Sequence, residues 1–274
     1  MIYIGNNFVQ ENQLYTSTLS EEEREMIDRM GRYPIKYTFL NNDHFLFVLH
    51  LRSSIIKASR DLFASEARFT TFENARCNER YWRLTVQGGF KLRDGIRPSD
   101  AINDIFQNGA KYGFECATAI VIIFYKAVLD SINRTQFDRI YQGMYLRDWQ
   151  SDDDLPIYTR RGNDFIPGDC LYFNNPQFDP KRPQWRGENV IDLSKGLYFA
   201  HGIGIKTAEG VIEALNKRRY PNATISAYLL SQVTRIDDYY LYQFENDSHR
   251  QGNVPRFISQ KKIVGRIGTH LYYD

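Results

Sequence analysis

The 274-residue sequence predicts an α+β fold in which a nucleophile-bearing helix packs on an antiparallel sheet. Apolar residues recur at helical spacing through the first half of the chain, whereas short strand-like segments follow from Leu155 onward. Between them lies a run of nine uncharged residues, Ala117 to Tyr125. Without repeats or a Pro/Ser-rich linker, we expect one domain over 1–274, with a core at about 99–233, an N-terminal helical part at about 1–98 and a C-terminal appendage at about 234–274.

Capping residues mark the expected helices. Ser20 followed by Glu23 is a capping-box pattern, which predicts a helix to about Met30. Asn42 or Asp43 can cap a second helix. Further helices are expected from Ser99 or Asp100 to Gly109, from about Phe114 to Ile132, and from about Thr207 to Arg218.

Strands are expected where apolar residues alternate between turn signals. Tyr81–Val86 alternates, and Gly88 with Gly89 turns the chain back into Phe90–Leu92. The later strands are expected at "LPIYT", "DCLYF", "ENVIDL", "LYFAHGIGI", "ISAYLLSQVTRI" and "DYYLYQF". The last stretch, "SHRQGNVPRFISQKKIVGRIGTHLYYD", predicts an irregular tail with one strand.

Composition excludes several classes of function. Thirty-five basic against 33 acidic residues leave a net charge of +2, too balanced for a nucleic-acid or anionic-membrane partner. No segment has the apolar length of a membrane span, and the N-terminus does not resemble a secretory signal, so we expect synthesis inside the cell. Three scattered cysteines form neither a disulfide framework nor a zinc motif, and we expect no metal and no cofactor.

Cys116 is the candidate nucleophile. A cysteine at a helix start is often only a small buried core residue. A thiol in the first helical turn, however, faces unpaired N–H groups and the positive end of the helix dipole, which favour the thiolate. The same N–H groups can bind the oxyanion that forms when the sulfur attacks a carbonyl.

Three residues are candidates to accept the thiol proton. Glu115 precedes Cys116 directly, so it reaches the sulfur only from a position outside the first turn. Glu188 opens an otherwise apolar strand, where the alternative is a residue at a solvent edge. His201 lies diagonal to Glu188 if Lys195 and Gly196 form a two-residue hairpin loop. A three-residue loop moves His201 to the other face, where it is a structural histidine.

The order of motifs resembles a known family. The segments are "FECATAIVIIFY", "PIYT", "GDCLYFNNPQFDP", "QWRGENVI" and "YFAHGIGI". Together they are similar to the spore-coat protein-glutamine γ-glutamyltransferases of bacilli, which are bacterial transglutaminases. That family in turn resembles the papain-like NlpC-type cysteine enzymes. Here Glu188 stands where those enzymes carry their catalytic histidine.

The resemblance implies a calcium-independent acyltransferase that forms ε-(γ-glutamyl)lysine isopeptides and releases ammonia. It places the nucleophile on Cys116 and the general base on Glu188, with Glu115 as a second base. The substrates would be spore-coat proteins that bear glutamine and lysine, and the enzyme would assemble onto the spore from the mother-cell cytoplasm. We also expect the enzyme to be a monomer. We expect Trp149 and Trp185 to shield the substrate pocket from water.

Two other readings remain open from the sequence. A cysteine amidase or peptidase of the cell-wall hydrolase type would form the same thioester with water as the acceptor. A structural coat protein would keep the fold without catalysis.

Overall fold

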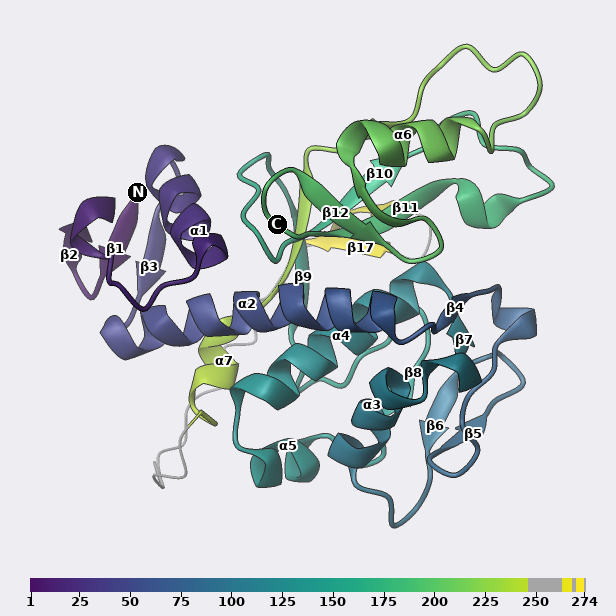
Figure 1. Cartoon of the computed structure of the whole chain (residues 1–274), viewed down its shortest axis with the longest axis horizontal. Helices are drawn as coiled ribbons and strands as arrows, with labels where there is room; N and C mark the ends of the chain where they lie inside the picture. The colour runs from purple at the N-terminus through teal and green to yellow at the C-terminus, as the bar shows by residue number, and fades with distance from the viewer. Residues whose placement is uncertain (246–262, 268–269, 274) are drawn as a thin grey trace.

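The protein is described here by a computed structural model that covers residues 1–245, 263–267 and 270–273. Two long helices, α2 and α4, lie side by side at its centre, with the largest sheet above them in Figure 1. The helices are α1 (Glu21–Arg32), α2 (Asn42–Ala64), α3 (Pro98–Gln107), α4 (Cys116–Ser131), α5 (Arg134–Ile140), α6 (Ala208–Asn216) and α7 (Asp238–Tyr242). Short 3-10 turns are η1 (Glu11–Gln13), η2 (Phe72–Asn74), η3 (Gly109–Lys111) and η4 (Pro183–Trp185).

Helix starts follow the capping signals closely. The Ser20 hydroxyl accepts a hydrogen bond from the Glu23 N–H at 3.1 Å, and the Glu23 carboxylate accepts one from the Ser20 N–H at 2.8 Å. The predicted capping box is therefore confirmed. The second helix begins one residue earlier than expected, because Asn41 accepts from the His44 N–H at 2.8 Å. α3 also begins early, at Pro98, whose fixed φ suits a first helical position.

The largest sheet has seven strands, and all its pairings are antiparallel. Its order is β13-β12-β11-β10-β15-β9, with β14 also beside β10. The strands are β9 (Ile157–Arg161), β10 (Cys170–Asn174), β11 (Gly187–Asp192), β12 (Leu197–Ala200), β13 (Gly204–Thr207), β14 (Tyr228–Leu229) and β15 (Gln232–Ile236). Since β15 is an inner strand that runs to Ile236, the sheet extends just beyond the expected start of the C-terminal appendage.

Smaller sheets surround this core. They are β2-β1-β3, β5-β6-β8 and β4-β7, and a separate β16-β17 hairpin lies near the C-terminus. Their strands are β1 (Ile2–Ile4), β2 (Asn7–Val9), β3 (Tyr37–Phe39), β4 (Arg68–Phe69), β5 (Trp82–Leu84), β6 (Phe90–Leu92), β7 (Gly113–Phe114), β8 (Tyr145–Leu146), β16 (Ile263–Ile267) and β17 (His270–Tyr273). The tail thus contains two strands where one was expected, and the rest of that stretch lies outside the described residues.

The segment "DYYLYQF" is a helix, so its prediction as a strand was wrong. The Asp237 side chain accepts a hydrogen bond from the Tyr239 N–H at 3.2 Å and caps α7. Leu241 is the residue of this helix that enters the core. The cap and one buried contact outweigh the β-propensity of the three tyrosines.

Two hydrophobic cores lie on opposite faces of the large sheet. The main core runs from Ile2 to Leu241 and includes the buried side chains of α2 and α4. The second core includes Val190 from β11 and Leu215 from α6. Among the described residues, no helix is both long and apolar enough to cross a membrane.

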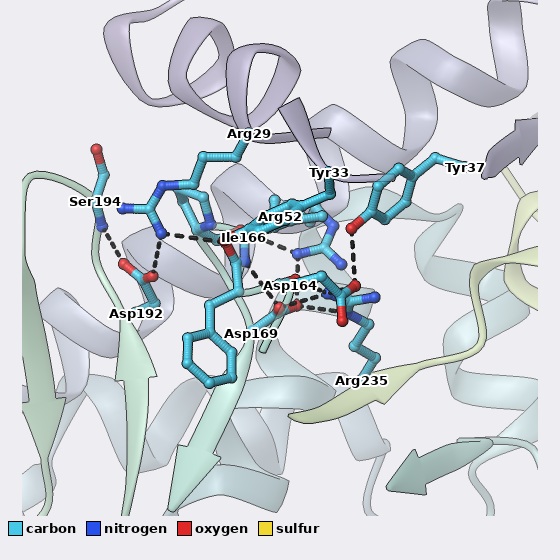
Figure 2. A network of polar contacts seen from close by, with 12 residues as sticks. Arg29, Tyr33, Tyr37, Arg52, Asp164, Ile166, Asp169, Asp192, Ser194 and Arg235 are labelled. Carbon is cyan, nitrogen blue, oxygen red and sulfur yellow. Dashed lines mark hydrogen bonds and ion pairs between the residues drawn. The ribbon is translucent and has the colours of Figure 1, made fainter. Parts of the chain in front are cut away.

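A buried ionic network attaches the N-terminal part to the sheet (Figure 2). Arg235 from β15 donates two hydrogen bonds to the Asp169 carboxylate, both at 2.7 Å, and Arg52 from α2 donates another at 2.8 Å. Tyr37 from β3 donates to Asp164 at 2.8 Å. Burial alone would raise the pKa of Asp169, but the two arginines outweigh it and hold that pKa below its ordinary value.

Candidate functional site

Cys116 is the first residue of the 16-residue helix α4, and Glu115 is its N-cap. The Ala119 N–H reaches the Glu115 carbonyl at 3.0 Å, so the N–H groups of residues 116–118 precede the first intrahelical bond. The Glu115 side chain does not bond to them. This helix start therefore presents main-chain donors beside the sulfur.

Asn189 is the residue that contacts the sulfur directly. Its side-chain amide donates to the Cys116 Sγ at 3.6 Å, and its main-chain N–H also acts on that sulfur. Both contacts favour the thiolate and lower the pKa of Cys116. Asn189 was not predicted from the sequence, because nothing in its neighbourhood there indicates which strand residue faces the helix.

Burial dominates the ionisation of the thiol. It raises the pKa of Cys116 far above the ordinary value, and the nearby Glu188 carboxylate raises it further. The two hydrogen-bond donors of Asn189 lower the pKa of Cys116, but the effects of burial and Glu188 are larger. The helix start was expected to favour the thiolate, whereas burial and the Glu188 carboxylate favour the neutral thiol.

Glu188 is a fully buried carboxyl group on β11. Neither of its oxygens has a hydrogen-bond partner among the described residues. Burial therefore raises its pKa well above 4.5, while Arg218 pulls it down and Glu115 pushes it up. A carboxyl group in this state is a strong proton acceptor once it ionises.

Side chains alternate between the two faces of β11, so Glu188 points to the face opposite to Gly187 and Asn189. Gly187 and Asn189 line the cavity that contains Cys116. Glu188 pairs in register with Phe173, whose side chain belongs to the second core. Strand alternation thus directs the carboxyl group to the second-core side of β11, close enough to the thiol to perturb its pKa.

Glu115 lies on the cavity side, where Asp148 is also part of the lining. Burial raises its pKa to about 7, and the negative charge of Asp148 adds to the rise. Arg186 and Arg147 act against this shift. Near neutral pH, Glu115 is consequently divided between its acid and base forms.

The cavity beside Cys116 has a volume of about 590 Å³. One wall consists of Glu115, Arg147 and Asp148, and the other of the connection between β10 and β11. Arg147 is held in place, with its guanidinium 4.7 Å from the centre of the Phe72 ring. A cavity of this size accommodates amino-acid side chains next to the thiol.

His201 does not lie diagonal to Glu188. Val190 pairs with Ala200, and the Leu193 N–H bonds the Leu197 carbonyl at 2.8 Å across a three-residue loop. A three-residue loop was the second of the two loop lengths considered from the sequence, and it places His201 on the face of the sheet opposite to Glu188. Its ring stacks on Phe114, with centroids 4.8 Å apart.

The environment of His201 keeps it neutral. Burial lowers its pKa to about 4, although hydrogen bonds to the backbone of Arg68 and Phe114 act in the opposite direction. At neutral pH the imidazole carries no charge.

The two predicted pocket tryptophans are not part of the lining of this cavity, although residues next to them in sequence are. Trp149 packs against the main core. Trp185 belongs to the second core, with Phe69 at 5.1 Å and the Arg218 guanidinium 3.8 Å from its ring centre. Among the described residues that line the 590 Å³ cavity, neither tryptophan occurs.

No group of three or more His, Cys, Asp or Glu side chains suited to a metal ion occurs within residues 1–245 and the two described C-terminal strands.

Comparisons with known proteins agree on one family. The family model for protein-glutamine gamma-glutamyltransferase matches residues 1–245. The protein-glutamine gamma-glutamyltransferase of Bacillus licheniformis is 48% identical over 237 residues, covering 86% of this chain and 96% of its own length. That of Bacillus cereus is 40% identical, covering 99% of this chain and 100% of its own length.

A solved structure supports the same relationship. The transglutaminase from Geobacillus stearothermophilus, without its C-terminal extension, is 53% identical to this chain. The match has a TM-score of 0.73 and covers 75% of this chain and 99% of the solved one.

Proposed function

This chain belongs to the protein-glutamine γ-glutamyltransferase family, the transglutaminases, and we propose that it works through a γ-glutamyl thioester on Cys116. The family activity joins glutamine and lysine side chains of proteins as isopeptides. The observation that supports this nucleophile is the position of Cys116, at the open start of α4 and in the wall of the cavity.

The first half of the reaction acylates the enzyme. The Cys116 sulfur attacks the side-chain carboxamide carbon of a substrate glutamine, and the thiol proton passes to the ionised carboxylate of Glu188. The oxyanion is stabilised by main-chain N–H groups at the start of α4. The intermediate then expels ammonia, which takes the proton from Glu188, and a thioester remains.

The second half transfers the acyl group to a lysine. The neutral amine attacks the thioester carbonyl, gives its proton to a carboxylate, and the sulfur leaves and recovers a proton. Glu188 is the principal acceptor. Glu115 serves as a second base, since a carboxyl group with a pKa of about 7 is partly ionised at neutral pH.

The raised pKa of Glu188 reduces the cost of the first proton transfer. Between an ordinary cysteine and an ordinary glutamate the transfer is uphill by about 4 pKa units, or roughly 6 kcal/mol. Burial of Glu188 narrows this gap, and the two donors of Asn189 stabilise the sulfur as it becomes negative. Proton transfer therefore accompanies attack, and the thiolate does not accumulate.

The arrangement supports a papain-like core of the NlpC type. A nucleophilic cysteine opens a helix that packs on an antiparallel sheet, and the base lies on the neighbouring strand. Glu188 replaces the histidine of those enzymes. His201, neutral and stacked on Phe114, supports the backbone directly before Glu115 and takes no part in proton transfer.

The setting follows from the family resemblance. The enzyme acts without calcium, as a monomer, on spore-coat proteins, and it reaches the coat from the mother-cell cytoplasm. Trp185 excludes water from the second-core side of the site and Trp149 from the main-core side, which favours the amine over hydrolysis.

The test is incorporation of a fluorescent primary amine into a glutamine-containing protein, with a chelator present. Wild type should incorporate the amine and Cys116→Ala should not. Release of ammonia without incorporation would instead identify a hydrolase. A requirement for added calcium would refute the calcium-independent scheme.

A further inference from the structure

A basic patch lies next to the cavity, on the β10–β11 connection and the residues that directly follow α6. The backbone of these two segments can be followed in Figure 1. Its members are exposed or partly exposed cations from two sequence segments. They are Lys181, Arg182, Arg186, Lys217, Arg218 and Arg219.

Backbone contacts join the two segments. Phe178 forms an isolated β-bridge with Arg219, and the Asp179 N–H bonds the Arg218 carbonyl at 3.0 Å. The Arg218 guanidinium covers Trp185 at 3.8 Å. The patch is therefore one continuous surface with fixed geometry.

Few carboxylates neutralise it. Among the described ion pairs, Asp179 binds Arg182 at 3.3 Å and Glu213 binds Lys217 at 2.7 Å. Arg219 bonds to carbonyl groups, including that of Ile225 at 2.7 Å. Two carboxylates form ion pairs with the six cations, and the Glu115 and Glu188 carboxyl groups also interact with Arg186 and Arg218. The patch still concentrates positive charge in a chain whose net charge is only +2.

The patch continues into the catalytic cavity. The same connection contributes Phe178, Pro183, Gln184 and Arg186 to the cavity wall. A chain segment that reaches Cys116 along this wall of the cavity therefore passes beside the patch.

We propose that the basic patch docks an acidic protein segment that carries the reacting glutamine. This inference rests on the proposed function and names the kind of acyl donor that the site selects. A lysine-bearing segment is itself cationic and is repelled by this surface, so the patch favours the donor over the acceptor. The position of the patch at the cavity rim favours a protein segment over a nucleic acid.

The experiment compares two glutamine peptides of otherwise identical sequence. One carries Asp residues beside the glutamine, and the other carries Asn at the same positions. The probe reaction is their coupling to a fixed concentration of a primary amine. Wild type should give a kcat/KM about 3- to 10-fold higher for the Asp peptide, the range expected for a few exposed charge pairs. Added salt should reduce this preference, because it screens exposed charges.

The variant is Lys181→Glu/Arg182→Glu. Both side chains are exposed and lie outside the cavity lining, whereas Arg186 and Arg218 are left intact because they act on Glu115 and Glu188. The variant should lose or invert the preference for the Asp peptide. The matched control Arg32→Glu/Lys36→Glu changes the same charge at exposed positions around the end of α1 and should keep the preference.

Equal kcat/KM values for the two peptides with wild type would overturn the docking proposal. So would a preference that persists in the patch variant or resists salt. Binding of a DNA oligonucleotide that only the patch variant loses, without any peptide preference, would assign the patch to nucleic acid. Wild-type turnover of the Asn peptide reports on the thioester chemistry separately, so failure of docking is distinguishable from failure of the proposed function.

Discussion

Replacement of Glu188 by Met should make the protein more stable while abolishing its main base. The Glu188 side chain is fully buried, and both of its oxygens lack partners among the described residues. A buried polar group without hydrogen bonds costs about 1–3 kcal/mol. Met has a similar length and removes that cost without leaving a large cavity.

The expected gain is a rise in Tm of about 2–12 °C, since about 1 kcal/mol shifts Tm by about 2–4 °C in a chain of this size class. The gain should depend on pH. Because the pKa of Glu188 is raised in the folded state, wild type benefits from its protonation below 4.5 and loses that benefit as pH rises through the folded-state pKa. The difference between variant and wild type should therefore grow as pH increases from 4 to 8.

The assay is thermal unfolding of both proteins across this pH range, with Glu79→Met as the control. Glu79 is exposed, so its replacement should leave Tm nearly unchanged at every pH. A Glu188→Met protein that is less stable than wild type at neutral pH would show that the carboxyl group has partners, and the reasoning would fail.

Three further predictions concern the base, the sulfur and the buried network. Glu188→Gln should retain weak amine incorporation. The rate of this residual reaction should rise as pH passes about 7, the pKa of Glu115, because only the ionised carboxylate accepts a proton. A residual rate that does not depend on pH would exclude Glu115 as the base of the residual reaction. Asn189→Leu should slow the alkylation of Cys116 by iodoacetamide by about tenfold, because the sulfur loses roughly 1–2 kcal/mol of stabilisation by hydrogen bonding. An unchanged alkylation rate would contradict the contact between Asn189 and the sulfur. Arg235→Met should reduce the free energy of unfolding by about 3–5 kcal/mol in denaturant titrations, since it leaves buried carboxylates without their main partner; a loss below about 1 kcal/mol would show that the network is not stabilising.

Local signals predicted the elements well. The capping box at Ser20 and the uncharged run before Tyr125 define two helices close to their observed bounds. Such features depend on neighbouring residues, so they are readable along the chain. The helix at α7 was missed because its tyrosines favour strands, and its cap at Asp237 is a single contact.

Register and side-chain contact were harder to predict. The loop after β11 has three residues, in which Ser194 and Lys195 adopt positive φ angles of 73° and 53° before Gly196. Non-glycine residues rarely adopt positive φ angles, so no local pattern in the sequence indicates a loop of this length. The one additional loop residue, relative to a two-residue hairpin, decides the face of the sheet on which His201 lies. The contact from Asn189 to the sulfur depends on packing between α4 and β11, which no local pattern specifies.

The most direct measurement is the intact mass of the enzyme after brief incubation with a glutamine peptide and no amine. The thioester mechanism predicts an adduct equal to the peptide less ammonia, located on Cys116, absent from Cys116→Ala and discharged on addition of a primary amine. An adduct on another residue, or amine incorporation by Cys116→Ala, would contradict the assignment of Cys116 as the nucleophile.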